Sequence, residues 1–283
     1  MNKIAFSIVT WNSASTIDPC LKSLEKTGTE TFVVDNNSSD DTVNKAEKYP
    51  WVKLIKNESN LGFATANNIA LKKVRSEFVF LLNPDAKLVN DALEKMVEFM
   101  KQNKEVGILG PRLLNADGSI QKEITPFPTL MNQILILLRL HRVPWFNELV
   151  YPNYDYNKIQ EAEHLMGSAL LIRKEVFEKV GGFDENFFLW FEETDFEKRA
   201  KKAGFKIVYY PKAVVHHLRS ASVKKINPLG RQTIWNKSLR YFFKKHKSKL
   251  EQLLLEPFIF LSYLPAFLLL VREKIKSGKK LLA

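Results

Sequence analysis

The sequence predicts an α/β fold in which a mostly parallel sheet carries helices on both faces, followed by an apolar helical tail. Three observations predict it. Short apolar segments alternate with segments of helical periodicity through residues 1–110, which is typical of a parallel sheet. Residues 78–82 are consecutive apolar residues, too few for an independent helix and typical of a strand buried on both faces. Residues 253–271 are almost entirely apolar.

Strands and helices follow one another in the first half of the chain. Residues 17–24 carry apolar side chains at helical spacing after two serines, either of which can cap a helix. Further helices are expected around residues 66–70 and 93–100, where the same spacing recurs. The strands expected here comprise residues 5–9, 32–34, 52–55, 78–82 and 106–109.

The second half is less regular. Residues 115–118 form a predicted turn between short strands. Residues 130–140 are strongly apolar and are interpreted either as a core helix or as a helix that faces an acceptor or lipid. The remaining elements predicted are strands at 166–173 and 206–210, a short helix at 174–180, and a helix that begins near Phe196.

These patterns predict a domain of residues 1–235 and a tail of residues 236–283. The domain divides into a nucleotide-binding half (1–110) and an acceptor-binding, catalytic half (111–235). In the tail, basic residues flank the apolar stretch on both sides, which suits attachment to an anionic leaflet. Two prolines and a glutamate interrupt the stretch, so a membrane-spanning helix is a weaker interpretation. A third interpretation is that the tail packs on the domain or on a partner subunit.

Composition narrows the classes of protein. With 283 residues, 45% of them hydrophobic, the chain can bury a full core. The balance of 43 Lys+Arg against 31 Asp+Glu gives a net charge of +12, which favours polyanions or an anionic membrane. The single cysteine, Cys20, excludes a disulfide framework and suits a reducing compartment. The apolar start is short, so we expect no signal peptide there.

Three polar loops share one predicted edge of the sheet, around Thr10, around Asp35 and at 83–85. Ligands of open α/β sheets bind beyond the carboxyl ends of the strands, so a nucleotide is expected there. Glycine-rich phosphate-binding motifs are missing from the sequence. Phosphate charge then needs another partner, which favours a divalent metal at Asp85. The alternative is that residues 83–85 form an ordinary turn.

A second acidic cluster, Glu192, Glu193 and Asp195, lies near the start of a predicted helix among four aromatic residues. These acids can serve merely to complement the helix dipole. Alternatively, apolar surroundings raise the pKa of a carboxyl toward the value that a general base needs. His216 and His217 follow a strand, where neighbouring side chains point to opposite faces, so at most one normally enters a site.

Several motifs, in the same order along the chain, resemble those of family 2 glycosyltransferases, and within them the rhamnosyltransferase-like branch. The resemblance runs from about residue 3 to about residue 222. The motifs are SIVTWN (7–12), VVDNNSSD (33–40), NLGFA (60–64), ANN (66–68), LNPDA (82–86), GGFD (181–184) and FF (187–188).

The resemblance implies a nucleotide-diphospho-sugar transferase (GT-A type) fold and an inverting, metal-dependent transfer. The family's D-x-D motif falls on residues 83–85, so Asp85 would bind Mg²⁺ or Mn²⁺. The metal-contacting histidine would be His217, with His216 as the alternative. The family's acidic pair falls on Glu192 and Glu193; Glu193 would be the base, Glu192 its alternative, and Asp195 matches the acid that follows.

The resemblance also implies a set of substrate-binding residues. The acid that holds the nucleobase matches Asp35, and Asn83 stands where the family's first metal-motif acid would be. The full expected set is Thr10, Asn12, Asp35, Asn37, Asn60, Gly62, Asn67, Asn83, Gly167 and Trp190.

The function implied is transfer of a sugar, best matched by rhamnose from dTDP-rhamnose, to a hydroxyl of a glycan or polyprenyl-linked acceptor in cell-surface polysaccharide synthesis. We expect a cytoplasmic protein, peripheral on the inner face of the cell membrane through its tail, and we consider a homodimer. The alternative is a non-catalytic subunit that binds a sugar nucleotide or glycan. Nucleic-acid binding is not expected, because the basic residues do not interleave with aromatics in a binding motif.

Overall fold

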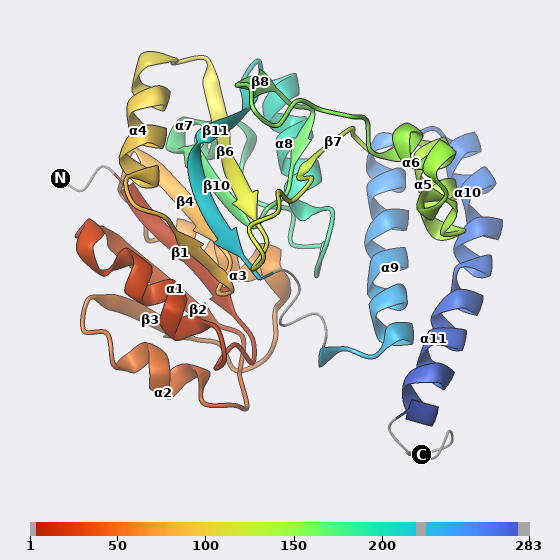
Figure 1. Ribbon diagram of the computed structural model, residues 1–283, viewed down its shortest axis with the longest axis horizontal. Helices are drawn as coiled ribbons and strands as arrows, with labels where there is room; N and C mark the ends of the chain where they lie inside the picture. Colours follow the sequence, from red (N-terminus) through yellow and green to blue (C-terminus); the bar gives the residue numbers. More distant parts are fainter. Residues whose placement is uncertain (1–3, 219–224, 277–283) are drawn as a thin grey trace.

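The computed structural model describes residues 4–218 and 225–276, and Figure 1 shows a sheet flanked by helices with a second group of helices beside it. The strands are β1 (Ile4–Thr10), β2 (Glu30–Asp35), β3 (Val52–Lys56), β4 (Phe78–Leu82), β5 (Ala86–Leu88), β6 (Val106–Leu114), β7 (Ile124–Thr125), β8 (Gln160–Glu161), β9 (His164–Leu165), β10 (Ala169–Arg173) and β11 (Lys206–His217). The helices are α1 (Ile17–Leu24), α2 (Thr42–Glu47), α3 (Gly62–Leu71), α4 (Ala92–Gln102), α5 (Leu130–Leu137), α6 (Pro144–Val150), α7 (Lys174–Val180), α8 (Glu192–Lys202), α9 (Pro228–His246), α10 (Lys249–Leu261) and α11 (Tyr263–Lys276).

Nine of the described strands form one sheet, in the order β3-β2-β1-β4-β10-β6-β11-β5, with β8 paired to β11. Strands β1 to β4 are mutually parallel, as the alternating pattern predicts. Beyond β4 the sheet is mixed, because β10 is inserted antiparallel between β4 and β6, and β5 pairs antiparallel with β11. The α/β class is confirmed, and the antiparallel strands come from the half of the sequence with the weaker pattern.

Helices cover both faces of the sheet. On one face, α1, α2 and α4 pack against alternate residues of the central strands, such as Phe6 and Phe80. On the other face, α3, α7 and α8 pack against the intervening residues, such as Ala5 and Val79. Strand β4 is buried along its whole length, as its unbroken apolar run predicts. The carboxyl ends of β1 and β4 therefore meet at one edge of a rigid support.

Three elements differ from the prediction. Helix α2 buries only Thr42 and Ala46, too few apolar positions to produce a periodic signal. Strand β5 is three residues long and completes the sheet edge beside β11. Strand β11 continues past Pro211 because the pairing register shifts between Tyr210 and Val214, and a proline is tolerated at such an irregularity.

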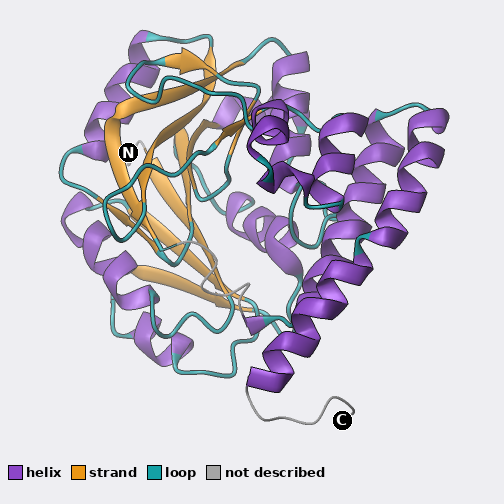
Figure 2. Ribbon diagram, turned by 45° about the vertical axis from the view of Figure 1, so that its right-hand side comes forward, coloured by secondary structure: helices purple, strands orange, loops and turns teal. Residues whose placement is uncertain are grey.

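The remaining helices, α5, α6 and α9 to α11, form a helical module (residues 130–150 and 228–276) to one side of the sheet (Figure 2). Its core joins Leu137 of α5, Phe242 of α9 and Ile259 of α10 to Phe187 and Phe191 of the loop before α8. The predicted helical tail is confirmed, and the basic residues Lys279 and Lys280 at its end lie outside the described residues.

Candidate active site

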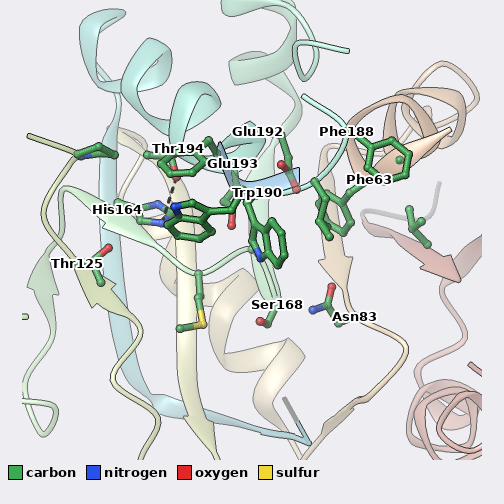
Figure 3. A pocket seen from close by; sticks show the side chains of 18 of the residues that line it. Phe63, Asn83, Thr125, His164, Ser168, Phe188, Trp190, Glu192, Glu193 and Thr194 are labelled. Atoms are coloured by element: carbon green, nitrogen blue, oxygen red, sulfur yellow. Dashed lines mark hydrogen bonds between the residues drawn. The ribbon is translucent and has the colours of Figure 1, made fainter. Parts of the chain in front are cut away.

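A pocket of about 490 Å³ opens where the carboxyl ends of β1 and β4 face the helical module. Asn83 and Asp85 line it from the sheet, Glu193 lines it from the first turn of α8, and Trp235 lines it from α9. Figure 3 shows the side chains of Asn83, Ser168, Trp190 and Glu193 around this space. The two acidic clusters, more than a hundred residues apart in sequence, therefore face the same pocket.

Asp85 and His217 lie together at the floor of the pocket. His217 Nε2 is 3.2 Å from Asp85 Oδ1, and both side chains are buried. On the other side of the ring, Nδ1 lies 3.0 Å from Gln121 Oε1. The Gln121 amide nitrogen donates to the His217 carbonyl, which orients the amide oxygen toward the ring. Because the Gln121 amide oxygen can only accept, Nδ1 donates to it, and Nε2 faces Asp85.

This arrangement fits a divalent cation. Buried His217 Nε2 has no hydrogen-bond partner among the described residues, although a carboxylate lies beside it. A metal-ligating histidine usually donates its other N–H to a fixed acceptor, as Nδ1 does here to Gln121. Within residues 4–218 and 225–276, however, no group of three or more His, Cys, Asp or Glu side chains gathers. Among the described residues, Asp85 and His217 would thus supply two ligands, which leaves positions for phosphate oxygens and water.

Glu192 and Glu193 sit at a strained turn. The two residues before them, Trp190 and Phe191, have φ angles of 67° and 71°, which non-glycine residues rarely adopt. Strain of this kind persists only where the surroundings hold it, and it concentrates at functional sites. The Leu189 carbonyl accepts a hydrogen bond of 2.8 Å from Ser238 of α9, which ties the turn to the helical module.

The carboxyls of Glu192 and Glu193 are differently placed. Burial, followed by the charge of Glu193, raises the pKa of Glu192 well above its ordinary value. The raised pKa of Glu192 favours its protonated form, which is a poorer proton acceptor than a carboxylate. Glu193 lies against Gly167, where an added Cβ would be 3.3 Å from Glu193 Cγ. A side chain at position 167 would thus press on Glu193, which explains why a glycine suits this position.

His164 is a pocket residue that the local sequence patterns did not indicate. Its Nδ1 is hydrogen-bonded to the buried carboxylate of Glu197, and its Nε2 lies 3.4 Å from Thr194 Oγ1 (Figure 3). Burial would lower the pKa of His164, but the charges of Glu197 and Glu193 raise it. His164 lies 29 residues before Glu193 and belongs to no local sequence motif. The two residues come together because β9 lies against the first turn of α8.

The expected nucleotide-binding residues divide into two groups. Asn60, Gly62 and Asn83 line the pocket, as does Asn36, which was not among the residues expected from the sequence. Asp35 lies just behind them, where its carboxylate accepts hydrogen bonds from Thr10 Oγ1 (2.8 Å) and Ser38 N (2.8 Å).

Gly62 links this loop to the turn before the acidic pair. Phe63 N donates to the Phe188 carbonyl at 2.8 Å, and a Cβ on Gly62 would overlap that carbonyl oxygen. The loop that carries the NLGFA motif is therefore packed directly on the turn that positions Glu193.

Several predicted residues lie outside the pocket. The Asp195 carboxylate is buried among Arg199 Nε (2.8 Å), Lys245 Nζ (2.8 Å) and His246 Nε2 (2.7 Å). Burial alone would raise the pKa of Asp195, but His246, Lys245 and Arg199 lower it below its ordinary value. The charge of Asp195 thus joins α8 to α9, and the catalytic role expected for it stays a prediction.

Four further predicted residues are not among those that line the pocket. Asn12 accepts a hydrogen bond from Ser39 N at 2.8 Å, which holds two loops together. Asn67 accepts one from Ser7 Oγ at 2.7 Å within the core. Asn37 is exposed with a φ of 58°, and His216 alternates to the face of β11 opposite His217. Of the two histidines, His217 is the one in the pocket.

The fold is that of the nucleotide-diphospho-sugar transferases of GT-A type. The chain belongs to glycosyl transferase family 2, whose model matches residues 6–181, and the N-terminal domain of galactosyltransferase matches residues 148–222. It is a glycosyltransferase of the rhamnosyltransferase-like branch, as the motifs predicted.

Two relatives are rhamnosyltransferases by name. The chain is 28% identical over 230 residues to N-acetylglucosaminyl-diphospho-decaprenol L-rhamnosyltransferase of Mycobacterium tuberculosis, covering 75% of this chain and 73% of that protein. It is 27% identical over 188 residues to the O-antigen chain rhamnosyltransferase WbaN of Salmonella anatum, covering 66% and 55%. Among solved structures, the mannosyltransferase PcManGT of Pyrobaculum calidifontis, in complex with GDP-Man and Mn²⁺, superposes with a TM-score of 0.58 at 17% identity, covering 98% and 81%.

Proposed function

We propose that this chain is an inverting, metal-dependent rhamnosyltransferase that uses dTDP-rhamnose and acts on a lipid-linked glycan. One observation carries the proposal: Asp85 with His217, and Glu193, line the same pocket from different elements. The donor diphosphate would lie on the Asp85 side and the acceptor hydroxyl on the Glu193 side. Both named relatives are rhamnosyltransferases, which supports the sugar.

The proposed reaction is a direct displacement. Glu193 takes the proton of an acceptor hydroxyl, and the resulting oxygen attacks the anomeric carbon of the donor sugar. The bond from that carbon to the diphosphate oxygen breaks, and the electron pair leaves with the nucleoside diphosphate. Attack from the face opposite the leaving group inverts the anomeric configuration. The raised pKa of Glu192 limits the negative charge beside Glu193.

Asp85 and His217 would hold Mg²⁺ or Mn²⁺. When bound, the cation would neutralise negative charge on the departing diphosphate. The support is the position of His217 Nε2 beside the Asp85 carboxylate, together with the Mn²⁺ named in the PcManGT complex. Asn83, at the first position of the metal motif, would bind the donor through its amide.

The acceptor would enter from the helical module. Trp190 and Trp235 pack edge to face at 5.6 Å between ring centroids and both line the pocket, and such aromatic surfaces suit a sugar ring. The decaprenyl diphosphate acceptor in the name of the Mycobacterium tuberculosis relative supports a polyprenyl-linked glycan. We place the protein on the cytoplasmic face of the membrane, attached peripherally through its tail, in cell-surface polysaccharide synthesis.

A screen followed by a transfer assay tests this function. Purified protein with Mn²⁺ is heated with dTDP-rhamnose, UDP-hexoses or GDP-mannose, and the ligand that raises the Tm most is then given with a polyprenyl-diphosphate-linked N-acetylglucosamine. The proposal expects dTDP-rhamnose to stabilise the protein and a rhamnosylated product to form. Donor binding without transfer to any acceptor would favour a non-catalytic subunit, and stabilisation by another nucleotide sugar alone would overturn the choice of donor.

A further inference from the structure

Exposed apolar side chains gather on the helical module. Among the described residues, 17 large hydrophobic side chains are exposed, and only Leu61, Ile120, Ile159 and Leu218 lie outside residues 130–150 and 228–276. Singly exposed apolar residues are ordinary on a protein surface, but a concentration on one module marks an interaction surface.

The exposed residues of α10 and α11 form one stripe. They recur at steps of three, four and seven residues, so they share one side of the helix; the stripe comprises Leu250, Leu253, Leu254, Phe260, Leu264 and Leu268. Ser262 between the two helices keeps helical dihedrals, so the stripe continues from one helix to the next. At 1.5 Å per residue the 27 residues of Lys249–Ile275 extend about 40 Å. The exposed side of this helix is thus an apolar face of substantial length.

The opposite side of the same helix is the one that packs on the protein. Leu255, Ile259, Ser262 and Ala266 are buried, and Ser262 Oγ accepts a hydrogen bond of 3.1 Å from Asn236 of α9. The most apolar 18-residue window of this stretch has a mean hydropathy of 2.0, which would allow a span by composition, but the buried side of the helix packs on α9 and α5. A helix bound in this way lies along the module, and the apolar stripe faces outward.

The charge of the module suits an anionic partner. The module, residues 130–150 and 228–276, contains 12 Lys and Arg but four acids, Glu148, Glu251, Glu256 and Glu273. Glu251 caps the start of α10, Glu256 is bound by Arg240 at 2.8 Å, and Glu273 lies 3.7 Å from Arg231. Three of the four acids thus have partners within the module, and the 12 basic residues leave an excess of positive charge around the stripe. The same charge would repel a second copy of this face.

Helix α6 adds a second apolar contact. Trp145 is 81% exposed and Leu149 57% exposed, and α6 packs on α5, which in turn packs on α10 (Figure 1). Tryptophan is enriched at the boundary between lipid headgroups and acyl chains, where its ring is apolar and its N–H is hydrated. The sequence of α6 alone does not indicate a membrane contact. Trp145 joins the module only because α6 packs on α5, which packs on α10.

We propose that the helical module lies in the plane of a bilayer that contains anionic lipids, with the α10–α11 stripe and Trp145 of α6 in the headgroup region. The module is also a wall of the pocket, through Gln133 and Ile136 of α5 and Trp235 of α9. A lipid-linked acceptor then reaches Glu193 while its chain stays in the membrane. This inference rests on the membrane attachment proposed above and adds its orientation and the part played by α6.

Vesicle flotation of the full chain, without donor or acceptor, tests the inference independently of transfer. We expect the protein to float with phosphatidylcholine vesicles that contain phosphatidylglycerol, and to float less with phosphatidylcholine alone because the basic residues then lack anionic partners. Phe260→Ser with Leu264→Ser should weaken binding about tenfold or more, and so should Trp145→Ser with Leu149→Ser, because each pair removes buried apolar area.

Ile120→Ser with Ile159→Ser, which removes exposed apolar residues outside the module, is the matched control and should bind as the parent does. Equal binding of the Trp145/Leu149 variant and the parent would overturn the role of α6. No binding to either vesicle, or a dimer that the Phe260/Leu264 variant dissociates, would overturn the lipid partner. Cys20 is buried, so cysteines introduced at Leu250 and Ile275 can be labelled selectively; labels on opposite sides of the bilayer would overturn the in-plane orientation.

Discussion

His217 Nε2 lies 3.2 Å from the carboxylate of Asp85, and the other nitrogen of the same ring is fixed by Gln121. The three residues come from the end of β11, the loop after β4 and the segment before β7. Sheet pairing of β11 with β5 sets His217 opposite Ala86, which brings the imidazole to Asp85. The geometry of the proposed metal site therefore depends on the register of a strand pair as much as on the acidic motif itself.

Gln121→Ala should weaken Mn²⁺ binding by roughly 10- to 100-fold, because the ring of His217 loses the acceptor that fixes its tautomer. Isothermal titration of Mn²⁺ in the presence of dTDP measures the effect. Gln102→Ala, on the exposed side of α4, is the matched control and should leave Mn²⁺ affinity unchanged. Unchanged affinity in Gln121→Ala would show that His217 does not ligate the metal.

Glu192→Gln should preserve transfer and stabilise the fold at neutral pH. Burial raises the pKa of Glu192, so the native state holds a proton that the unfolded chain loses as pH rises above about 4.5. The stability that this group contributes is present at low pH and lost as pH rises toward its folded pKa. The Tm of the variant should thus exceed that of the parent at pH 8 but match it near pH 4. An equal Tm difference at both pH values would contradict this.

Asp195→Ala should destabilise the protein, by about 3 kcal/mol at pH 7, without abolishing turnover of the folded fraction. Its pKa is lowered by His246, Lys245 and Arg199, so the stabilisation is present above the unfolded pKa of an aspartate and disappears as pH falls through the folded value. Urea unfolding at pH 7 and at low pH measures this dependence. Complete loss of turnover in correctly folded Asp195→Ala would restore a catalytic role.

Gly62→Ala should impair both stability and activity, because the new methyl group would meet the Phe188 carbonyl and displace the turn before Glu192. Gly118→Ala is the control for backbone strain: its φ of 81° matches the 83° of Gly62, but a Cβ added at Gly118 would meet nothing within 4 Å. Thermal unfolding of both variants separates the two effects. A similar loss of Tm in the two would mean that strain alone, and not the contact with Phe188, matters.

His164→Gln should change the pH dependence of kcat more than it changes the maximal value of kcat. The ring lies between Glu197 and the first turn of α8, and the carboxylates that raise its pKa include Glu193. Replacing a ring whose pKa is raised by nearby carboxylates with a neutral amide should shift the acidic limb of the kcat profile. The pH profile of kcat for parent and variant measures the shift. A proportional loss at every pH would indicate only a structural role.

Local sequence signals predicted the first half of the fold and three acidic residues that line the pocket, Asp85, Glu192 and Glu193. The buried run 78–82 and the polar residues after it are both sequence-local, so β4 and Asp85 were predictable. Asn36 and Gln121 were not, because each enters the site from a loop without periodicity. His164 enters the site because β9 packs against α8. The Asp195 carboxylate is bound by Lys245 and His246, which lie about fifty positions away in the sequence. Long-range packing decided these roles.

The initial rate of sugar transfer by Glu193→Gln at saturating donor tests the central claim most directly. Because the amide keeps the shape of the side chain but cannot accept the proton, we predict a loss of at least about 100-fold in kcat, with the Kd for donor and Mn²⁺ unchanged. Near-normal turnover in this variant, with donor bound as tightly as in the parent, would show that Glu193 is not the base.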